Sequence, residues 1–131
     1  MLKEQGQAAG ELGKKGEDVA AKYLNDKGFK VLALNARFRT GEIDIVASKK
    51  GELHFVEVKS RKSVVFAAPS EFVTRSKINK ILSAAQIFLS SDETGKKFRS
   101  APCHFDVISV NYSKSPPAIE FIPDAFEADE R

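Results

Sequence analysis

Two strand-like runs on either side of a short glycine turn constrain this chain more than any other feature. Residues 42–47 and 53–60 alternate between polar side chains and apolar ones, many of them β-branched or aromatic. The polar segment between them contains Gly51. Such a pattern predicts an antiparallel hairpin, with Lys50 and Gly51 as the turn residues.

The register of this hairpin predicts a patch of charge. With the turn at 50–51, Asp44 lies directly opposite Glu57, and Glu42 lies opposite Lys59. Opposed residues share one face of a sheet, and close carboxylates repel one another. A shared proton, a salt bridge or a bound metal ion would relieve that repulsion. Mg²⁺ is suited to the last role because it prefers carboxylate oxygens and keeps several waters.

Two other interpretations of the same residues remain open at this point. The charges could form a solvated face of an open sheet, with Lys59 paired to Glu42. A slip of one residue in the register would place Asp44 and Glu57 on opposite faces and remove the patch.

Size and composition favour one soluble globular domain. The chain has 131 residues, of which 42% are apolar and 30% are charged. We expect a single domain over residues 1–131, with a flexible N-terminal arm at 1–12 and an acidic tail at 124–131. The first residues lack an apolar run, so we expect neither a signal peptide nor a membrane span.

Cysteine and histidine are scarce in this chain. The single cysteine, Cys103, excludes an internal disulfide and favours a reducing cytoplasm. With only two histidines, His54 and His104, we expect no zinc cluster.

The remaining patterns predict an α/β fold. The order α-β-β-β-α-β-β gives one mixed central sheet with helices packed on it. Thr74 is a typical N-cap for the second helix. The elements expected outside the hairpin are helices at 13–27 and from Thr74 to Leu89, strands at 29–38, 104–112 and 118–122, and a polar loop at 91–102.

Basic side chains are expected near the patch from three segments. The first 119 residues carry a net charge of +7 and the last twelve carry −4, and a basic body is compatible with nucleic acid. Cations in the first turns of a helix oppose the helix dipole, so anion binding explains them better than a structural role. The candidate phosphate contacts are Arg37 and Arg39 on one face of the first strand, Arg61 and Lys62 after the hairpin, and Arg75, Lys77 and Lys80 in the second helix.

Glu17 is the remaining candidate in the first helix. It is in line with Ala20, Ala21 and Leu24, at the edge of the face expected to be buried. A glutamate in the first turn can also serve only to complement the helix dipole.

Together these residues resemble the PD-(D/E)XK nuclease superfamily. The shared pattern is an acid in a first helix, an aspartate on one strand and Glu-x-Lys on the next, here Glu17, Asp44, Glu57 and Lys59. The chain is more similar to the YraN-type family of bacterial proteins, which resembles archaeal Holliday junction resolvases. The matching segments are GKKGEDVAAKYL at 13–24, NARFRTGEIDIVA at 35–47, FVEVKSR at 55–61, the helix that carries Lys77, and FDV at 105–107.

Two departures from the family pattern stand out. His104 replaces the usual arginine before FDV, and the segment 66–69 lacks the usual glycine after its phenylalanine. Both lie away from the carboxylates, so they bear on substrate contacts more than on metal binding.

The resemblance implies a restriction-endonuclease-like fold and a metal-dependent endonuclease acting on structured or branched DNA, with a homodimer as the assembly of junction-cutting relatives. Lys59 would position the attacking water or stabilise the transition state. The implied ligands of Mg²⁺ or Mn²⁺ are Asp44 and Glu57, with Glu17 in support and the Val58 carbonyl as a further candidate, and the implied contacts to the DNA backbone are Arg37, Arg61, Arg75 and Lys77.

The same residues leave two alternative functions to consider. A nuclease-like fold could hold DNA or RNA without cutting it. A glycosidase built on paired carboxylates is disfavoured, because the chain has no tryptophan and only two tyrosines to stack on sugars.

Overall fold

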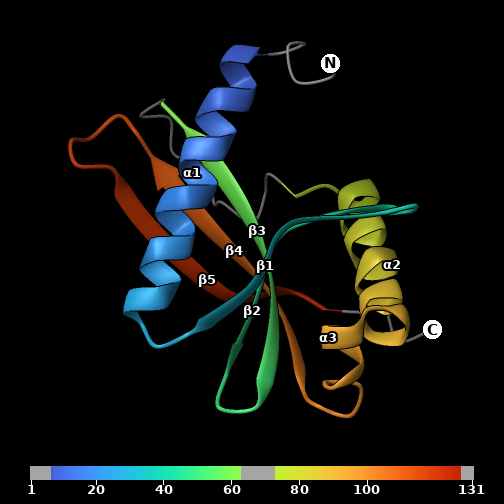
Figure 1. Ribbon diagram of the computed structural model, residues 1–131. Coiled ribbons are helices and arrows are strands. Elements are labelled where there is room, and N and C mark those ends of the chain that lie inside the picture. Colours follow the sequence, from blue (N-terminus) through green and yellow to red (C-terminus); the bar gives the residue numbers. More distant parts are fainter. Residues whose placement is uncertain (1–6, 63–72, 128–131) are drawn as a thin grey trace.

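Five strands form one sheet that lies between helices (Figure 1). The computed structural model describes residues 7–62 and 73–127, with side chains from residue 13 onward. None of the helices in these ranges is both long and apolar enough to cross a membrane. The elements are α1 (Gln7–Asp26), β1 (Lys30–Phe38), β2 (Gly41–Lys49), β3 (Glu52–Arg61), α2 (Arg75–Ser91), α3 (Glu93–Lys96), β4 (Cys103–Asn111) and β5 (Ala118–Phe126).

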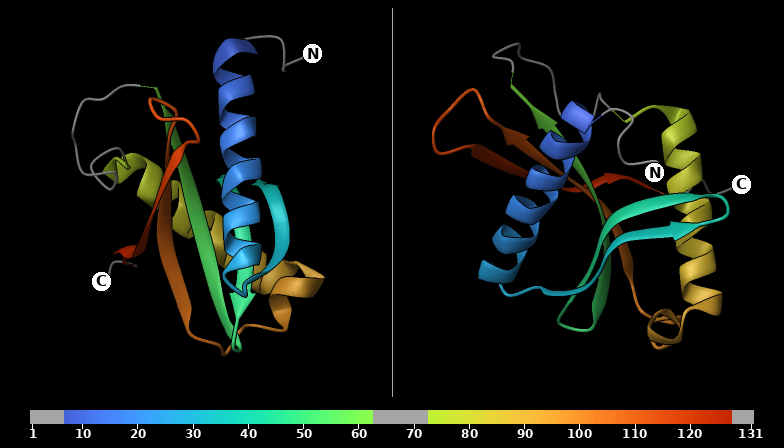
Figure 2. Two further views of the ribbon diagram at one scale, coloured as in Figure 1. Left: turned by 90° about the vertical axis from the view of Figure 1, so that its left-hand side faces the viewer. Right: turned by 45° about the horizontal axis from the view of Figure 1, so that its top comes forward.

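The sheet is mixed, as the sequence predicts. Its strand order is β1-β2-β3-β4-β5, and only the β3–β4 pair is parallel. A parallel pair needs a long connection, and here that connection contains α2 and α3. Figure 2 shows from two further sides that α1 covers one face of the sheet and α2 the other. The predicted α/β class and element order are therefore confirmed, with α3 as an addition.

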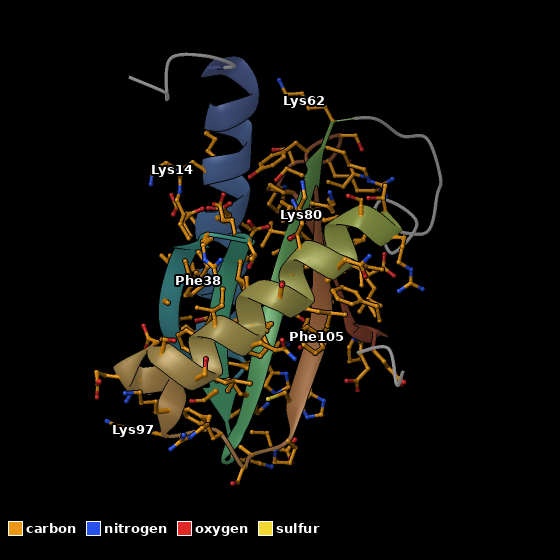
Figure 3. The ribbon with its side chains drawn as sticks, turned by 90° about the vertical axis from the view of Figure 1, so that its right-hand side faces the viewer. Lys14, Phe38, Lys62, Lys80, Lys97 and Phe105 are labelled. Atoms are coloured by element: carbon orange, nitrogen blue, oxygen red, sulfur yellow. The ribbon has the colours of Figure 1, made fainter. Side chains whose placement is uncertain are left out.

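Both faces of β4 are buried, as predicted for an interior strand. Val107 packs in the core under α2, whereas Ile108 and Val110 pack in the core under α1. Phe105 lies on the face that α2 crosses (Figure 3) and stacks on Phe55, with ring centroids 5.3 Å apart. A strand covered on both sides reads as continuously apolar, which is why its alternation is weak in the sequence.

The β2–β3 hairpin has the register derived from the sequence. Lys50 and Gly51 form its turn with φ values of 52° and 80°, the left-handed pair that a two-residue hairpin turn requires. The pairs run from Lys49–Glu52 to Ile45–Val56, and there the described ladder ends. Because β2 leaves β3 at this point, the prediction that Glu42 opposes Lys59 is wrong: Glu42 pairs with Arg37 of β1 instead.

The β1–β2 hairpin bends where it leaves β3. Asn35 has a φ of 51°, a left-handed conformation that asparagine tolerates better than most residues. The β1–β2 ladder also shifts register between Val31 and Ala33, and Leu34 is 47% exposed. The residues that pack toward α2 are Leu32, Ala33, Ala36 and Phe38 on β1, and Ile43 and Val46 on β2.

The bent end of this hairpin lies against α2 (Figures 1 and 2). Gly41 makes the contact, and a Cβ at this position would lie 2.8 Å from the carbonyl oxygen of Lys80. No side chain fits there without moving one backbone away from the other. Gly41 therefore sets how closely the hairpin approaches the helix.

Helix boundaries depend on local hydrogen bonds. Thr74 caps α2 as predicted, because its side chain accepts a hydrogen bond of 3.1 Å from the Lys77 N–H. Asp92 caps α3 in the same way, accepting from the N–H groups of Thr94 and Gly95. The short helix α3 therefore interrupts the segment expected to be a polar loop.

The ends of the chain also differ from expectation. α1 begins at Gln7, so residues 7–12 of the expected arm are helical, and residues 1–6 lie outside the described part. β5 continues to Phe126, four residues past its expected end, while residues 128–131 of the acidic tail lie outside the description.

Candidate functional site

The departure of β2 exposes one edge of β3. From Glu57 to Arg61, β3 pairs with β4 on one side only within the described residues. An N–H on the open edge needs another acceptor. The Val58 N–H donates to Oδ2 of Asp44 at 2.9 Å, so this carboxylate takes the place of the missing strand. Asp44 and Glu57 thus lie next to each other, although the β2–β3 ladder ends one pair before them.

Glu57 is the buried acid of the site, with only 4% of its surface exposed. Its Oε2 lies 3.3 Å from the Lys77 ammonium and 3.6 Å from that of Lys59. Its Oε1 is buried without a hydrogen-bond partner among the described residues. A buried carboxylate oxygen without a partner is costly, so Oε1 is the atom at which an added cation or donor would stabilise the site most.

Asp44 holds its proton unusually strongly. Burial, followed by the negative charge of Glu57, raises the pKa of Asp44 to about 8, although the hydrogen bond from Val58 opposes this shift. Near neutral pH, the pair can therefore relieve its repulsion by keeping one proton. A metal ion would compete with that proton for the same oxygens.

Glu17 reaches the same place from α1. Burial raises its pKa, a hydrogen bond from the Asn35 side chain opposes this rise, and the charges of Glu42 and Glu57 add to it. The preceding Gly16 lies so close to β3 that a Cβ would clash with Ser60 Oγ. The missing side chain of Gly16 therefore allows α1 to bring Glu17 to the sheet.

Lys77 belongs to the acid group rather than to an outer ring of cations. Partial burial would lower its pKa, but the charge of Glu57 and the hydrogen bond to it outweigh burial and raise the pKa. We define the acidic junction as Glu17, Asp44, Glu57, Lys59 and Lys77. The sequence singled out all five of these residues, but it predicted Lys77 as a phosphate contact, and it missed Asn35 as the partner of Glu17.

The other predicted cations form no single cluster. Lys62 is exposed at the end of β3, at the opposite end of the molecule from Lys97 (Figure 3). Arg61 is half-buried on β3, and Arg75 is exposed at the start of α2. Three cations line a hollow of about 400 Å³ between the bent hairpin and α2, which we call the hairpin hollow; its lining residues are Arg37, Phe38, Arg39, Thr40, Gly41, Glu42 and Lys80.

The donor set of the acidic junction fits a hard divalent ion held by two carboxylates. In the described part of the chain, the acids Glu17, Asp44 and Glu57 do not place one ligand oxygen each within 4.8 Å of the others. The adjacent pair Asp44 and Glu57 is the part that could hold an ion, through Oε1 of Glu57 and the second oxygen of Asp44. Mg²⁺ is commonly held by one or two carboxylates, with waters and substrate phosphates as the other ligands.

Comparison with known proteins gives a consistent match. The family model described as Uncharacterised protein family UPF0102 matches residues 16–110 of this chain. A UPF0102 protein of Geobacter metallireducens is 43% identical over 116 residues, covering 88% of this chain and 92% of the relative. One of Clostridium perfringens is 42% identical over 113 residues, covering 85% and 89%. A third, of Syntrophotalea carbinolica, is 41% identical over 118 residues, covering 90% and 93%.

Proposed function

This chain belongs to the UPF0102 family, the YraN-type family, and from that premise and the acidic junction we propose that it is a metal-dependent endonuclease. The proposed substrate is structured or branched DNA, and the proposed ion is Mg²⁺ or Mn²⁺. The observation that carries the proposal is the Asp44–Glu57 pair: two adjacent, partly or fully buried carboxylates, one with a pKa raised to about 8 and the other with an orphaned oxygen.

The groups of the acidic junction have complementary tasks in phosphodiester hydrolysis. A bound divalent ion would supply Lewis acidity toward the phosphoryl group and a lower pKa for the attacking water. Asp44 and Glu57 would hold that ion through their oxygens, and Glu17 would add negative charge from α1. The Lys59 ammonium, 3.6 Å from Glu57, would stabilise the charge that develops on the phosphate oxygens.

In this reaction water attacks phosphorus and gives up a proton to solvent, while the bond from phosphorus to one ester oxygen breaks and that leaving oxygen takes up a proton from solvent. Asp44 would hold the ion as a carboxylate, so the proton that its raised pKa retains in the metal-free chain would leave when an ion binds. The open edge of β3 gives a phosphate room beside these groups, because β2 has already turned away.

The cations outside the acidic junction supply positions for the DNA backbone. The hairpin hollow holds Arg37, Arg39 and Lys80, and it adjoins the junction through Glu42. Arginine and lysine side chains of this kind give sequence-independent affinity for phosphates. A binding mode without base contacts is suited to an enzyme that recognises the shape of a branch.

A cleavage assay tests the proposal. The protein is stripped of metal and incubated with a four-way junction, a flap and a linear duplex in Mn²⁺ or Mg²⁺. We expect metal-dependent nicking of a branched substrate, reduced at least about 100-fold in Asp44→Ala, since that change removes a metal ligand. Asp26→Ala is the matched control, because Asp26 is an exposed acid that pairs with Lys22 on α1.

The control variant should cleave like the wild type. Absence of cleavage on every substrate, or cleavage of equal rate in Asp44→Ala, would overturn the proposal. Equal loss in Asp44→Ala and Asp26→Ala would point to general damage to the fold and would also count against a specific role for Asp44.

One observation favours a second candidate, a nucleic-acid-binding module that does not cut. Lys77 already compensates Glu57 at 3.3 Å, as a metal ion would. This candidate predicts salt-dependent binding that survives in Asp44→Ala and Glu57→Gln but weakens in Arg75→Ala/Lys77→Ala. Full retention of binding in the double variant would contradict it.

A further inference from the structure

Five titratable side chains lie together at the start of β3 and β4, away from the acidic junction. We call them the histidine cluster: Glu52, His54, His104, Asp106 and Asp124. The parallel register of β3 and β4 places His54 directly beside His104. Their rings stack, with centroids 4.5 Å apart and planes 17° from parallel. Glu52 lies two residues before His54, so its side chain leaves the same face of the sheet.

A carboxylate holds one nitrogen of each imidazole. Nδ1 of His54 lies 2.8 Å from Oδ2 of Asp106, and Nδ1 of His104 lies 2.8 Å from Oδ1 of Asp124. Asp106 is fully buried, and its second oxygen accepts the Asp124 N–H at 2.8 Å. In both rings Nε2 is therefore the nitrogen left for a further ligand. Metal-binding histidines almost always have such a carboxylate or carbonyl on the other nitrogen.

Asp124 on β5 reaches this position because the strand is irregular there. The β4–β5 register shifts between Phe105 and Val107, and Asp124 lies in the extra residues of β5 with a φ of 48°. Such a bulge re-aims a side chain that would otherwise follow the regular alternation. The bulge is what allows Asp124 to meet both His104 and the buried Asp106.

The ligand-type atoms of three residues converge in front of these carboxylates. Nε2 of His104 lies 2.6 Å from Oε1 of Glu52. Glu52, His54 and His104 each place one ligand atom within 4.8 Å of the others. Two ligands of a tetrahedral zinc ion lie roughly 3.3 Å apart for bonds of 2.0–2.1 Å. The Glu52–His104 pair would need to widen only by roughly 0.7 Å, which the partly exposed side chains allow.

A proton on Nε2 of His104 would compete with a metal ion for this place. Hydrogen bonds to Asp124 and Glu52 raise the pKa of His104, because both of its ring nitrogens then donate to carboxylates. An ion bound at Nε2 must displace that proton. Proton release on metal binding is therefore a signature that an ion pair alone would not give.

We propose that Glu52, His54 and His104 form a binding site for a zinc-class divalent ion, with Asp106 and Asp124 orienting the two imidazoles. Two imidazoles and one carboxylate, with a fourth position left to water, are a ligand set suited to zinc and poorly suited to Mg²⁺. The site does not depend on the proposed nuclease activity. His54 and Glu57 are three positions apart on β3, so their side chains leave opposite faces of the sheet.

The histidine cluster is shielded from water on one side, and such a setting strengthens the attraction between an ion and its ligands. The edge of the Phe29 ring packs against His54, with centroids 4.9 Å apart and planes at 82°. His54 retains only 13% side-chain exposure, whereas Glu52 retains 44%. One side of the cluster is thus apolar and rigid, and the other is open to solvent for entry of an ion.

Calorimetric titration of the metal-stripped full chain with Zn²⁺, and separately with Mg²⁺, tests the proposal. We expect one Zn²⁺ per chain, with release of about one proton at pH 6.5 when buffers of different ionisation enthalpy are compared. Binding should weaken at least tenfold in His104→Gln and in Glu52→Gln. Asp124→Asn, which removes an orienting carboxylate, should weaken it by about 10–100-fold. Mg²⁺ should not compete.

The matched control is Asp44→Asn, which alters the acidic junction and leaves the histidine cluster intact. Its affinity for Zn²⁺ should equal that of the wild type. Circular dichroism shows whether each variant folds. If a histidine variant does not fold, Glu52→Gln keeps the test valid, because the side chain of Glu52 is 44% exposed. The proposal is overturned if the wild type shows no stoichiometric Zn²⁺ binding, or if the loss follows Asp44→Asn instead of Glu52→Gln.

Discussion

The acidic junction and the histidine cluster lie along the same strand, and they balance their charges in opposite ways. In the junction, Asp44 and Glu57 are adjacent acids, and one oxygen of Glu57 has no described partner. In the cluster, each of the two imidazoles is matched with a carboxylate. Counted as formal charges, the acidic junction is neutral when Asp44 carries a proton, because Glu17 and Glu57 are then matched by Lys59 and Lys77. The histidine cluster has three carboxylates against one charged imidazole when His104 carries a proton, so it stays negative.

This difference teaches which cation each region can accept. A hard ion with oxygen ligands relieves the acidic junction directly, because it replaces the proton on Asp44. The histidine cluster gains from a softer ion that accepts imidazole nitrogen, since the proton there is already well accommodated. Two regions of one strand are therefore expected to respond to different metals and to different substitutions.

The largest expected effect is a double dissociation between the two regions. Glu57→Gln should lower Mn²⁺-dependent DNA cleavage at least about 100-fold, because it removes a metal-binding carboxylate, and should leave Zn²⁺ affinity unchanged. His104→Gln should weaken Zn²⁺ binding and leave Mn²⁺-dependent DNA cleavage unchanged. Cleavage rates and Zn²⁺ titrations on both variants provide the measurement. A loss of both properties in either variant would show that the two regions are not independent.

The next effect is on stability, and it depends on pH. Asp44 holds a proton more tightly in the folded chain than in the unfolded one, so folding stability falls as pH rises from about 4 to about 8. Asp44→Asn keeps an oxygen acceptor for the Val58 N–H but removes this loss. The melting temperature in EDTA should therefore rise at pH 8 by a few degrees, of the order of 3–6 °C, and by less at pH 5. A pH-independent difference would contradict the charge balance described for the junction.

A smaller effect is expected on DNA affinity. Lys80→Ala removes a cation from the hairpin hollow, so it should weaken binding a few-fold and reduce the slope of log affinity against log salt by about one. Lys97→Ala is the matched control, because this exposed lysine lies at the far end of the molecule from Lys62 (Figure 3). Fluorescence anisotropy over a range of salt concentrations measures both. Equal slopes for the wild type and Lys80→Ala would show that the hairpin hollow does not contact the DNA phosphates.

The smallest effect concerns His104. Its raised pKa means that its ion pairs stabilise the fold fully below the unfolded pKa near 6.5, and that this contribution is lost as pH rises through the folded value. His104→Gln should therefore cost at most about 1 kcal/mol at pH 5.5 and less at pH 9, as expected for partly exposed pairs. Urea denaturation at the two pH values gives the difference. If His104→Gln lowers the free energy of unfolding more at pH 9 than at pH 5.5, the protonated His104 does not stabilise the fold as described.

Local signals in the sequence account for much of the fold. The turn residues Lys50 and Gly51 determine the β2–β3 register, and Thr74 determines the start of α2. The apolar residues of β4 indicate a strand buried on both faces. Each of these features depends on neighbours in the chain, which is why periodicity and capping rules predict them.

The bend of the β1–β2 hairpin depends on tertiary packing and could not be derived in the same way. Asn35 is a weak signal for the bend, since asparagine tolerates a positive φ, and the alternation of the strand does not indicate that Leu34 is exposed. Gly41 allows the bent end of the hairpin to lie close to the backbone of α2, a contact that depends on the tertiary structure. As a result, the sequence predicted the residues of the acidic junction but not that Asp44 would accept the Val58 N–H.

The histidine cluster also could not be predicted from local signals, because its residues are far apart in the sequence. Fifty residues separate His54 from His104, and only the parallel pairing of β3 and β4 brings them together. The expectation of no zinc cluster rests on the number of histidines and does not take account of Glu52, which offers a carboxylate oxygen within 4.8 Å of a nitrogen of each histidine.

Gly41 links packing to acidity in this molecule. Any larger residue would push the bent hairpin off the Lys80 carbonyl, and Asp44, three residues further along β2, would move with it. Water would then reach the Asp44 carboxyl, and its pKa would fall toward the ordinary value. A substitution at Gly41, which changes no ionisable group, would in this way lower the pKa of Asp44 in the acidic junction. The position of the α2 backbone thus affects the pKa of Asp44 on β2.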